Sequence, residues 1–419
     1  MIGVSDRVRL GVVGCGVVAT AYYLPFILDH EEAALVAVCD LDGERARACA
    51  RLFGAAETYT DYFAMLERSE LDAVLILTAP GTHARFALAA AERGLHLLLQ
   101  KPMALTLADA TAIVEAVDAA GVKCVVEPSS QSPLDPDWRH LRALIDRGVL
   151  GDPYWFTLIP KAGPRYSGML GGNPYGNAAF FAKDSGGVIF DYPYMPTQIV
   201  TLLGDCASVV ATARISAPDR MIVPEGDYTR WLSERTDPRD CNYWDAVLTM
   251  EKTERIVMEA NDNVFSTYTM ASGWVGDVHV GRPFHPTYGD TAGSGGLQVF
   301  GVGGNLILGG PHMASFISER RDLLPEVDEA GWYHVPARGD LTKARWPQPV
   351  PGAFNYYAES TRHLCDCILR DEEPVVNASW GRHITEMMWG SLESSRTGRR
   401  YTMTTTTRGL REGGGVGVV

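Results

Sequence analysis

A glycine-rich segment near the start of the chain has the spacing of a phosphate-binding turn. Gly14, Gly16 and Ala19 form a GxGxxA pattern between a run of apolar residues and a helical stretch. The first glycine permits a tight turn, the second lets a phosphate approach the backbone, and the small alanine allows close packing of helix on strand. Because a helix N-terminus attracts anions, this pattern predicts binding of a dinucleotide pyrophosphate.

A carboxylate follows the second apolar run at the distance that such a site needs. Asp40 lies 24 residues after Gly16. A carboxylate there accepts hydrogen bonds from ribose hydroxyls and repels a 2′-phosphate, which favours NAD over NADP. For His83 the sequence leaves open a contact with the cofactor or a place as a helix cap. The predicted cofactor-binding residues all follow the carboxyl ends of apolar runs: Gly14, Cys15, Gly16, Val17, Val18, Asp40, Leu41, Thr78, Ala79, Pro80, His83, Gln100, Lys101 and Glu127.

Lys101 is the residue best suited to move a proton at this edge. It directly follows the apolar run Leu95–Leu99 and Gln100, and Pro102 fixes the chain behind it. An ammonium group in a partly dry site beside a positively charged nicotinamide is destabilised, so its pKa is expected to fall toward neutral pH. The sequence therefore predicts Lys101 as a general acid or base.

Two alternating periods in the first 126 residues predict the elements that position these groups. Strands that are apolar throughout and alternate with helices indicate a parallel, doubly wound α/β sheet whose ligands lie at the carboxyl ends of the strands. The predicted strands are Val8–Val13, Leu35–Cys39, Ala73–Leu77, Leu95–Leu99 and Val122–Val126. The predicted helices are Ala19–Leu28, Glu44–Phe53, Tyr62–Leu66, Thr82–Arg93 and Leu107–Ala119.

The rest of the chain predicts an α+β domain around an open, mostly antiparallel sheet. A helix is expected at Asp137–Arg147 and a helical region from Asn355 to Ser395. Residues 216–243 and 273–296 are expected to be long connections, which are often functional. The predicted strands are Tyr154–Pro160, Ala207–Ile215, Trp244–Met250, Arg255–Ala260, Thr267–Ser272 and Leu297–Leu308. The expected division is a cofactor domain at 1–126, a substrate and oligomerisation domain at 127–403, and a disordered tail at 404–419.

Composition narrows the classes of partner. The 419 residues carry 37 basic and 51 acidic side chains, a net charge of -14, which argues against a nucleic-acid or anionic-membrane binder. The eight cysteines form no pair of CxxC units, so neither a metal site nor a disulfide framework is predicted. The sequence has no run of 18 apolar residues and no signal-peptide pattern, so a cytoplasmic protein is expected.

Several motifs together resemble the Gfo/Idh/MocA family of oxidoreductases. They are Gln100–Pro102, Leu141–Asp152, Leu297–Gly304 and Ser394–Arg399. The resemblance implies an N-terminal Rossmann domain and a C-terminal α/β domain whose open sheet pairs subunits into a homodimer or homotetramer. It also implies NAD-dependent hydride transfer at a secondary alcohol or ketone of a sugar, glycoside, cyclitol or polyol, with Lys101 moving the proton.

The family's second signature is altered. Within Gly186–Val200, Asp191 matches the family, but Met195 occupies the usual histidine position and Gln198 the place of a second aspartate. Gln100 likewise replaces the usual glutamate before Lys101. Helical spacing predicts that Asp191 and Met195 share one face. A thioether carries no titratable proton, so Met195 cannot replace an imidazole in proton transfer.

Three interpretations remain open at the sequence level. Lys101 moves the proton with help from Asp191; or a group from Tyr192, Tyr194 or His285 replaces the histidine; or ordinary dehydrogenase chemistry is lost. The catalytic set is Lys101, Asp191 and Tyr194. The predicted substrate-binding set is Lys101, Lys161, Arg165, Tyr175, Asp191, Tyr192, Met195 and His285. Alternative functions are redox-neutral lyase, epimerase or glycoside-cleaving chemistry through a transient ketone on tightly bound NAD, and a non-catalytic NAD-binding protein.

Overall fold

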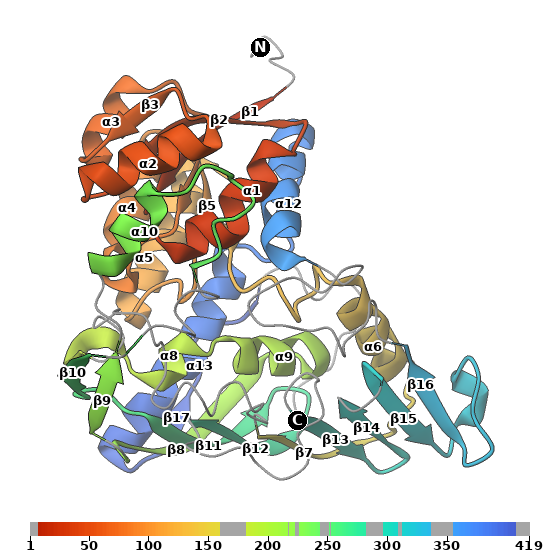
Figure 1. Ribbon diagram of the computed structural model, residues 1–419. Helices are drawn as coiled ribbons and strands as arrows, with labels where there is room; N and C mark the ends of the chain where they lie inside the picture. The colour runs from red at the N-terminus through yellow and green to blue at the C-terminus, as the bar shows by residue number, and fades with distance from the viewer. Residues whose placement is uncertain are drawn as a thin grey trace.

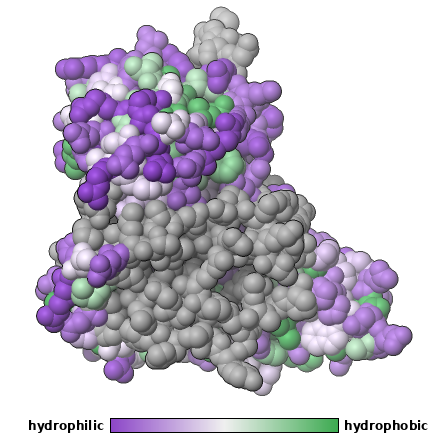
Figure 2. All heavy atoms as spheres, in the orientation of Figure 1, coloured by the Kyte–Doolittle hydropathy of each residue, from purple (hydrophilic) through white to green (hydrophobic). Residues whose placement is uncertain are grey.

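The chain forms two parts, each consisting of one large sheet and the helices packed on it (Figure 1). We call them the upper and the lower layer, after their places in Figure 1. The computed structural model describes residues 7–159, 182–216, 218–222, 226–243, 251, 253–281, 296–308, 312–336 and 355–407. The N-terminal sheet lies in the upper layer of the view and the C-terminal sheet along the lower edge. The visible outer surface of the upper layer is mainly hydrophilic, with scattered apolar side chains (Figure 2).

The upper layer is the predicted doubly wound fold. Its six strands are all parallel, in the order β3-β2-β1-β4-β5-β6. The strands are β1 (Val8–Val13), β2 (Ala33–Cys39), β3 (Glu57–Tyr59), β4 (Ala73–Ile76), β5 (His96–Leu99) and β6 (Cys124–Val126). The helices between them are α1 (Leu24–Leu28), α2 (Gly43–Phe53), α3 (Tyr62–Arg68), α4 (His83–Ala91) and α5 (Leu107–Ala120). All four residues of β4 are buried, as expected for a central strand covered on both faces.

The first predicted helix is divided in two. Residues Ala19–Tyr23 form a π-helical turn, and α1 follows with Pro25 in its first turn. Proline tolerates the first turn because it has no N–H to donate, so a new helical segment begins there. The division directs Tyr22 and Tyr23 into the buried interior.

The lower layer confirms the prediction of an open, mostly antiparallel sheet. Its nine strands have the order β16-β15-β14-β13-β7-β12-β11-β8-β17, and within it β7 and β12 pair in parallel. The strands are β7 (Pro153–Ile159), β8 (Cys206–Arg214), β11 (Asn263–Met270), β12 (Val275–Gly281), β13 (Gly296–Gly301), β14 (Gly304–Leu308), β15 (Ala314–Ser318), β16 (Trp332–Val335) and β17 (Tyr401–Thr402). The helices above it are α6 (Pro136–Asp146), α8 (Val188–Asp191), α9 (Tyr194–Leu203) and α13 (Ala378–Thr397).

The opposite face of this sheet exposes large apolar side chains. Trp155 and Ile159 of β7, Phe265 of β11 and Val210 of β8 are among them. Along β11 the burial alternates strictly, so one face packs under the helices and the other is open.

Several predicted boundaries were wrong because they ignored turns. The single strand expected at Leu297–Leu308 is the hairpin β13–β14, since the chain reverses at Val302–Gly303. The expected connection 273–296 contains β12, and the connection 216–243 contains β9 (Asp219–Ile222) and α10 (Gly226–Ser233). β9 pairs with β10 (Glu254–Val257) in a separate ribbon. The strand predicted at Trp244–Met250 lies outside the described residues.

Part of the segment assigned to a disordered tail is held in place. Glu386 of α13 accepts hydrogen bonds from the backbone and hydroxyl groups of Thr404 and Thr405, and Asp205 accepts two from Thr407. Two later helices also cross to the upper layer: α12 (Tyr356–Arg370) contacts α1, and α10 contacts α2. In the described part of the chain, no helix is long and apolar enough to cross a membrane.

Candidate active site

The two layers bring Lys101 and Asp191 together. Lys101 follows β5, and Asp191 ends α8. The Lys101 Nζ lies 2.9 Å from Asp191 Oδ1 and donates a second hydrogen bond, of 3.0 Å, to the Asp191 carbonyl oxygen. The two side chains are 17% and 20% exposed, so the pair borders solvent without being open to it. This contact joins two candidates that lie 90 residues apart in the sequence.

Gly187 lies at the start of the helix that carries Asp191. Gly187 has a φ of +71°, and a Cβ there would lie 2.5 Å from the Asn261 carbonyl oxygen. The Val188 N–H donates to the same oxygen over 2.7 Å. Only glycine fits this approach, so the conformation of Gly187 sets where α8 begins and thereby where Asp191 lies.

The protonation of Lys101 differs from the expectation. Burial lowers the pKa of this ammonium group, but the charge and hydrogen bond of Asp191 together with the neighbouring Tyr194 and Tyr192 raise it more, so the pKa lies above its ordinary value of 10.5. The predicted shift toward neutral pH is therefore not present in the protein alone. Lys101 carries its proton at neutral pH and is prepared to donate it.

A buried polar network supports the Lys101 backbone. Gln100 accepts the Lys101 N–H over 2.9 Å and donates to the Tyr23 hydroxyl over 2.8 Å. Tyr23 in turn donates to Glu127 over 2.9 Å. Burial raises the pKa of Glu127 above its usual value although several hydrogen bonds, the first from Ser360, lower it. Gln100 and Glu127 thus lie in the wall behind Lys101.

Tyr194, a member of the predicted catalytic set, lies beside the lysine, and sequence reasoning missed the other tyrosines that gather around it. Nζ of Lys101 lies 5.6 Å from the ring centroid of Tyr194, a cation–π distance. Tyr357 of α12 stacks on Tyr22 at 4.3 Å and lies 3.9 Å from Tyr356, centroid to centroid. Burial and then the neighbouring Tyr194 phenol raise the pKa values of Tyr356 and Tyr357 well above 10, so both keep their protons. The tyrosine pairs at 22–23 and 356–357 were the available sequence signal.

The altered histidine position begins a separate helix. Asp191 and Met195 do not lie on one continuous helix as expected, because α8 ends at Asp191 and α9 begins at Tyr194, after Pro193. Met195 is 6% exposed and packs in the apolar core. Tyr192 lies in the break between the two helices.

The glycine-rich turn has the features that a dinucleotide needs. Gly14 has a φ of +93°, and a Cβ there would lie 2.6 Å from the Leu77 carbonyl oxygen. The helix that follows begins at Val18 without a side-chain cap, and the side chains of Cys15 and Val17 are buried. The backbone of this turn is therefore what can hold phosphates.

Asp40 lies directly beside this turn. Its carboxylate accepts the Cys15 N–H over 2.8 Å and the Asp42 N–H over 2.9 Å, and Arg45 Nη1 lies 3.7 Å away. The next side chain, Leu41, is 94% exposed. A carboxylate next to an exposed apolar side chain fits the ribose and adenine of NAD.

Thr78 and His83 join neighbouring strand ends. Thr78 contacts the Thr82 hydroxyl over 2.7 Å, and Ala79 and Pro80 form the following turn. His83 is fully buried, with Nδ1 2.8 Å from the Pro102 carbonyl and Nε2 3.0 Å from the Thr78 carbonyl. Both ring nitrogens face backbone, so the imidazole ties the loop after β4 to the loop after β5 that presents Lys101.

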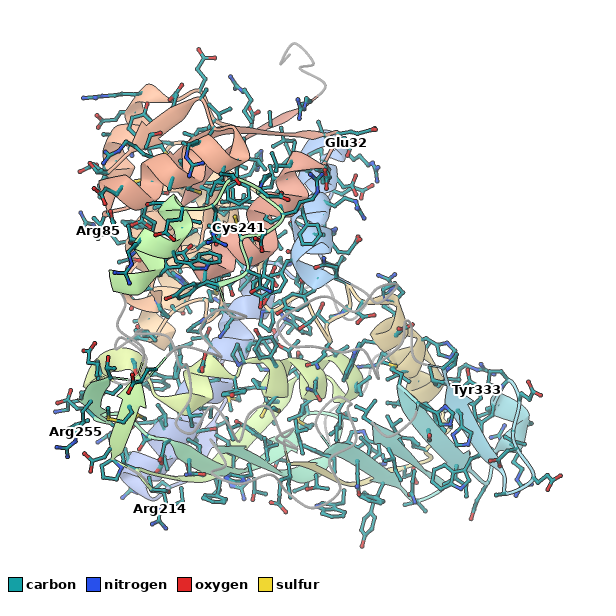
Figure 3. The ribbon with its side chains drawn as sticks, viewed as in Figure 1. Glu32, Arg85, Arg214, Cys241, Arg255 and Tyr333 are labelled. Atoms are coloured by element: carbon teal, nitrogen blue, oxygen red, sulfur yellow. The ribbon has the colours of Figure 1, made fainter. Side chains whose placement is uncertain are left out.

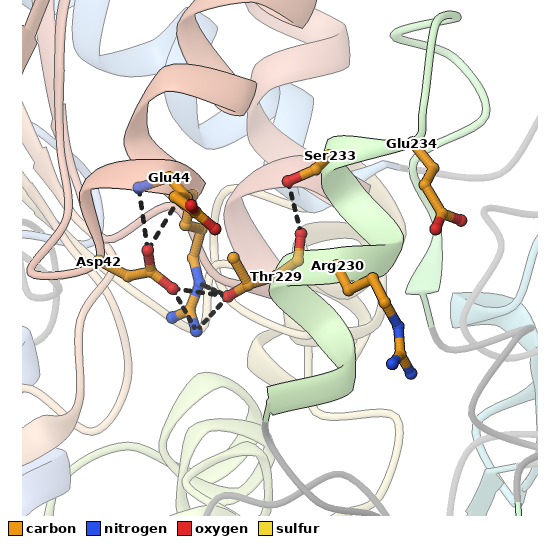
Figure 4. A pocket seen from close by; sticks show the side chains of 7 residues that line it. Asp42, Glu44, Thr229, Arg230, Ser233 and Glu234 are labelled. Atoms are coloured by element: carbon orange, nitrogen blue, oxygen red, sulfur yellow. Dashed lines mark hydrogen bonds and ion pairs between the residues drawn. The ribbon is translucent and has the colours of Figure 1, made fainter.

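A cavity of about 770 Å³ opens beside Asp42 and Arg45, the two residues that contact the Asp40 carboxylate from α2 and the turn before it (Figure 4). It is lined by Asp42, Glu44, Arg45, Thr229, Arg230, Ser233 and Glu234. Four of the predicted substrate-binding residues, Lys161, Arg165, Tyr175 and His285, lie outside the described residues.

The N-terminal layer matches a known family. Residues 8–127 match the description "Oxidoreductase family, NAD-binding Rossmann fold" of Gfo/Idh/MocA proteins. Residues 8–127 therefore belong to the NAD-binding Rossmann part of the Gfo/Idh/MocA family. It is similar to D-apiose dehydrogenase of Paraburkholderia graminis, with 33% identity over 49% of this chain and 54% of that protein. It is also similar to inositol 2-dehydrogenase of Pseudomonas fluorescens, with 32% identity over 38% of this chain and 48% of that protein.

The matched stretches span only about half the length of those curated relatives. The likeness in fold extends further. A structure of levoglucosan dehydrogenase in complex with NADH and levoglucosan superimposes with a TM-score of 0.72, covering 95% of this chain and 99% of that one at 18% identity. At that identity the likeness establishes the shared two-layer fold.

Proposed function

We propose that this protein is an NAD-dependent oxidoreductase of the Gfo/Idh/MocA type acting on a secondary alcohol or ketone of a sugar, glycoside or cyclitol. The observation that carries the proposal is the Lys101–Asp191 pair at the carboxyl end of β5. It lies at the carboxyl ends of the strands, the side of the sheet that also carries the glycine-rich turn and where ligands of doubly wound folds bind. The names of the relatives, which specify apiose, inositol and levoglucosan, support the substrate class.

The mechanism assigns the proton to Lys101. Bound NAD(H) supplies or accepts the hydride. In carbonyl reduction the Lys101 ammonium donates a proton to the substrate oxygen and becomes a neutral amine; in alcohol oxidation the amine takes the hydroxyl proton. Asp191 holds Nζ in place with a charge-assisted hydrogen bond and favours the protonated form. Tyr194 lies next to the same ammonium group and can orient the substrate hydroxyl.

The cofactor residues are proposed in the same way. The backbone of Gly14–Val18 holds the pyrophosphate, Asp40 the ribose hydroxyls, and Leu41 with the Ala79–Pro80 turn flanks the adenine. Of the predicted set, Gln100, Glu127 and His83 are assigned a supporting place because their polar atoms contact protein groups. NAD is preferred over NADP because a 2′-phosphate would approach the Asp40 carboxylate.

The test is a substrate panel of D-apiose, inositol and levoglucosan with NAD, comparing wild type with Lys101→Met. The variant is expected to lose at least a hundredfold in kcat while keeping its NADH affinity. Lys123→Met is the matched control. This lysine pairs with Asp371 and Glu373 at the amino end of β6, whereas Lys101 lies at the carboxyl end of β5. Full activity in Lys101→Met contradicts the assignment.

The same assay separates the alternatives. Turnover without net NADH formation, with deuterium exchange at a carbinol carbon, indicates a redox-neutral lyase, epimerase or glycoside-cleaving reaction. NADH binding without turnover on the whole panel indicates a non-catalytic member.

We further propose that a second copy covers the exposed apolar face around Trp155 and Phe265, giving a homodimer or homotetramer. Light scattering of wild type and Phe265→Asp measures this: a monomeric wild type contradicts it.

A further inference from the structure

A segment from the second half of the chain packs against the glycine-rich turn. It comprises residues 226–243, which we call the docking segment, and it begins with α10. The chain leaves the lower layer through β9 and returns through β10, and the two strands pair in a ribbon. Figure 1 shows α10 next to α2 in the upper layer, and Figure 3 places Cys241 of the same segment there.

The contact with the turn is a buried chain of hydrogen bonds. Tyr228, which is 0% exposed, donates its hydroxyl proton to the Cys15 carbonyl oxygen over 2.9 Å. The same hydroxyl lies 3.0 Å from Thr20 Oγ1, and Thr20 donates to the Cys241 carbonyl over 3.3 Å. Cys15 is the middle residue of Gly14-Cys15-Gly16, so Tyr228 contacts the backbone of the glycine-rich turn itself.

This contact fixes the orientation of a peptide plane. In a trans peptide the C=O and the following N–H point in opposite directions. Holding the Cys15 carbonyl toward Tyr228 therefore holds the Gly16 N–H away from it. Asp40 holds the other side of the residue, since its carboxylate accepts the Cys15 N–H over 2.8 Å. Both peptide groups of Cys15 are thus set by side chains.

The docking segment has further anchors that do not involve the Tyr228 hydroxyl. Thr229 accepts two hydrogen bonds from Arg45 and donates one to Asp42 (Figure 4). Arg51 of α2 donates to the carbonyl oxygens of Ser233 and Arg235. The segment therefore stays docked when the hydroxyl alone is removed.

We propose that Tyr228 is a positioning residue of the cofactor site, which aims the Gly16 N–H at the pyrophosphate of the bound dinucleotide. The proposal rests on the proposed NAD binding. A turn held in its binding conformation before the ligand arrives loses less freedom on binding, which favours affinity. Tyr228 is therefore expected to affect the affinity for any ligand that contains an adenosine diphosphate group, whether or not the ligand carries a nicotinamide.

The test is Tyr228→Phe, measured by titration with NADH and with ADP-ribose, a probe that lacks the nicotinamide. The loss of one buried hydrogen bond is expected to weaken both ligands about three- to tenfold. The KM for NAD rises by a similar factor, while kcat at saturating NAD stays unchanged. Arg51→Met is the matched control: it removes two docking bonds far from the turn and is expected to bind both ligands as wild type does.

Each outcome is decisive. Unchanged affinities in Tyr228→Phe overturn the inference, and so does an equal loss in Arg51→Met, which would mean that docking as a whole matters and not the peptide plane. Thr20→Val is the second variant should Tyr228→Phe fail to fold; it removes the neighbour of the Tyr228 hydroxyl and is expected to weaken both ligands about twofold, whereas unchanged binding overturns the inference. A wild type that binds neither ligand rejects the proposed function itself.

Discussion

The most direct perturbation of the site is Asp191→Asn, which removes the charge facing Lys101 and keeps the shape of the side chain. Burial lowers the pKa of Lys101, whereas the charge and hydrogen bond of Asp191 raise it, with further contributions from Tyr194 and Tyr192. Asp191→Asn removes the largest of these raising effects and leaves burial in place. The pKa of Lys101 is therefore expected to fall.

The size of the fall follows from the distance. For charges 2.9 Å apart, Coulomb's law gives about 5.7 kcal/mol at an effective dielectric constant of about 20 and about 1.4 kcal/mol in water. Since both side chains are partly exposed, the true value lies between these limits. Asp191→Asn removes this attraction, so the pKa of Lys101 falls.

The assay needs neither cofactor nor substrate. The chain has only six lysines, so a protein labelled with ¹³Cε-lysine gives few signals, and Lys101→Arg identifies the one from Lys101. The Lys101 signal of Asp191→Asn is expected to titrate at lower pH than that of the wild type. Asp371→Asn, which removes a partner 3.1 Å from Lys123, is the control and shifts only the Lys123 signal. An identical Lys101 titration in wild type and Asp191→Asn refutes the ion pair.

The same shift predicts how the pair contributes to stability. Because the folded-state pKa of Lys101 is raised, its contribution is fully present below the unfolded-state value and is lost as the pH rises through the folded-state value. Asp191→Asn therefore lowers the free energy of unfolding at pH 7, and the difference from wild type shrinks at strongly alkaline pH.

Three further predictions concern the fold and the cofactor. Gly14→Ala places a Cβ 2.6 Å from the Leu77 carbonyl oxygen at positive φ and is expected to cost about 2–4 kcal/mol in urea unfolding, whereas Gly54→Ala, with positive φ but open space, costs about 1 kcal/mol. Burial raises the pKa of Glu386, but the hydrogen bonds from Thr404 and Thr405 together lower it by more, so the pKa lies below its ordinary value of 4.5. The contribution of Glu386 to the free energy of unfolding is therefore present above that pH and is lost on acidification. Glu386→Gln should therefore cost about 2 kcal/mol at pH 7 and less at pH 4. Asp40→Ser is expected to lower the ratio of NADPH to NADH dissociation constants at least tenfold, and an unchanged ratio contradicts the ribose assignment.

The positions of Gly14, Asp40 and Lys101 after the carboxyl ends of β1, β2 and β5 could be predicted because their signals are local. The order of apolar runs fixes which strand ends lie on one edge, so Gly14, Asp40 and Lys101 could be brought together without coordinates. The close approach of Gly14 to the Leu77 backbone, directly after β4, needs a residue without a Cβ, so the glycine in the sequence already signals it. A parallel sheet turns linear order into spatial order, and the sequence carries that order directly.

The remaining parts depend on contacts between distant segments. Tyr357 reaches Tyr22 across 335 positions, and Tyr228 reaches Cys15 across 213. Periodicity describes which face of an element is apolar, and it carries no information on which other element covers that face. The docking segment was interpreted as a connection for the same reason: its helix is short, and the surface that it covers belongs to another layer.

The replaced histidine is best understood through the break between α8 and α9. Pro193 cannot donate a backbone hydrogen bond to continue α8, so Tyr194 begins a new helix and Met195 turns into the core. An imidazole at such a position would be desolvated among apolar side chains, which disfavours its charged form. Position 195 in this chain is therefore buried, and its thioether carries no titratable proton. The proton must be carried by groups already at the sheet edge, and within the described residues Lys101, held by Asp191 and bordered by Tyr194, is the cation placed to do so.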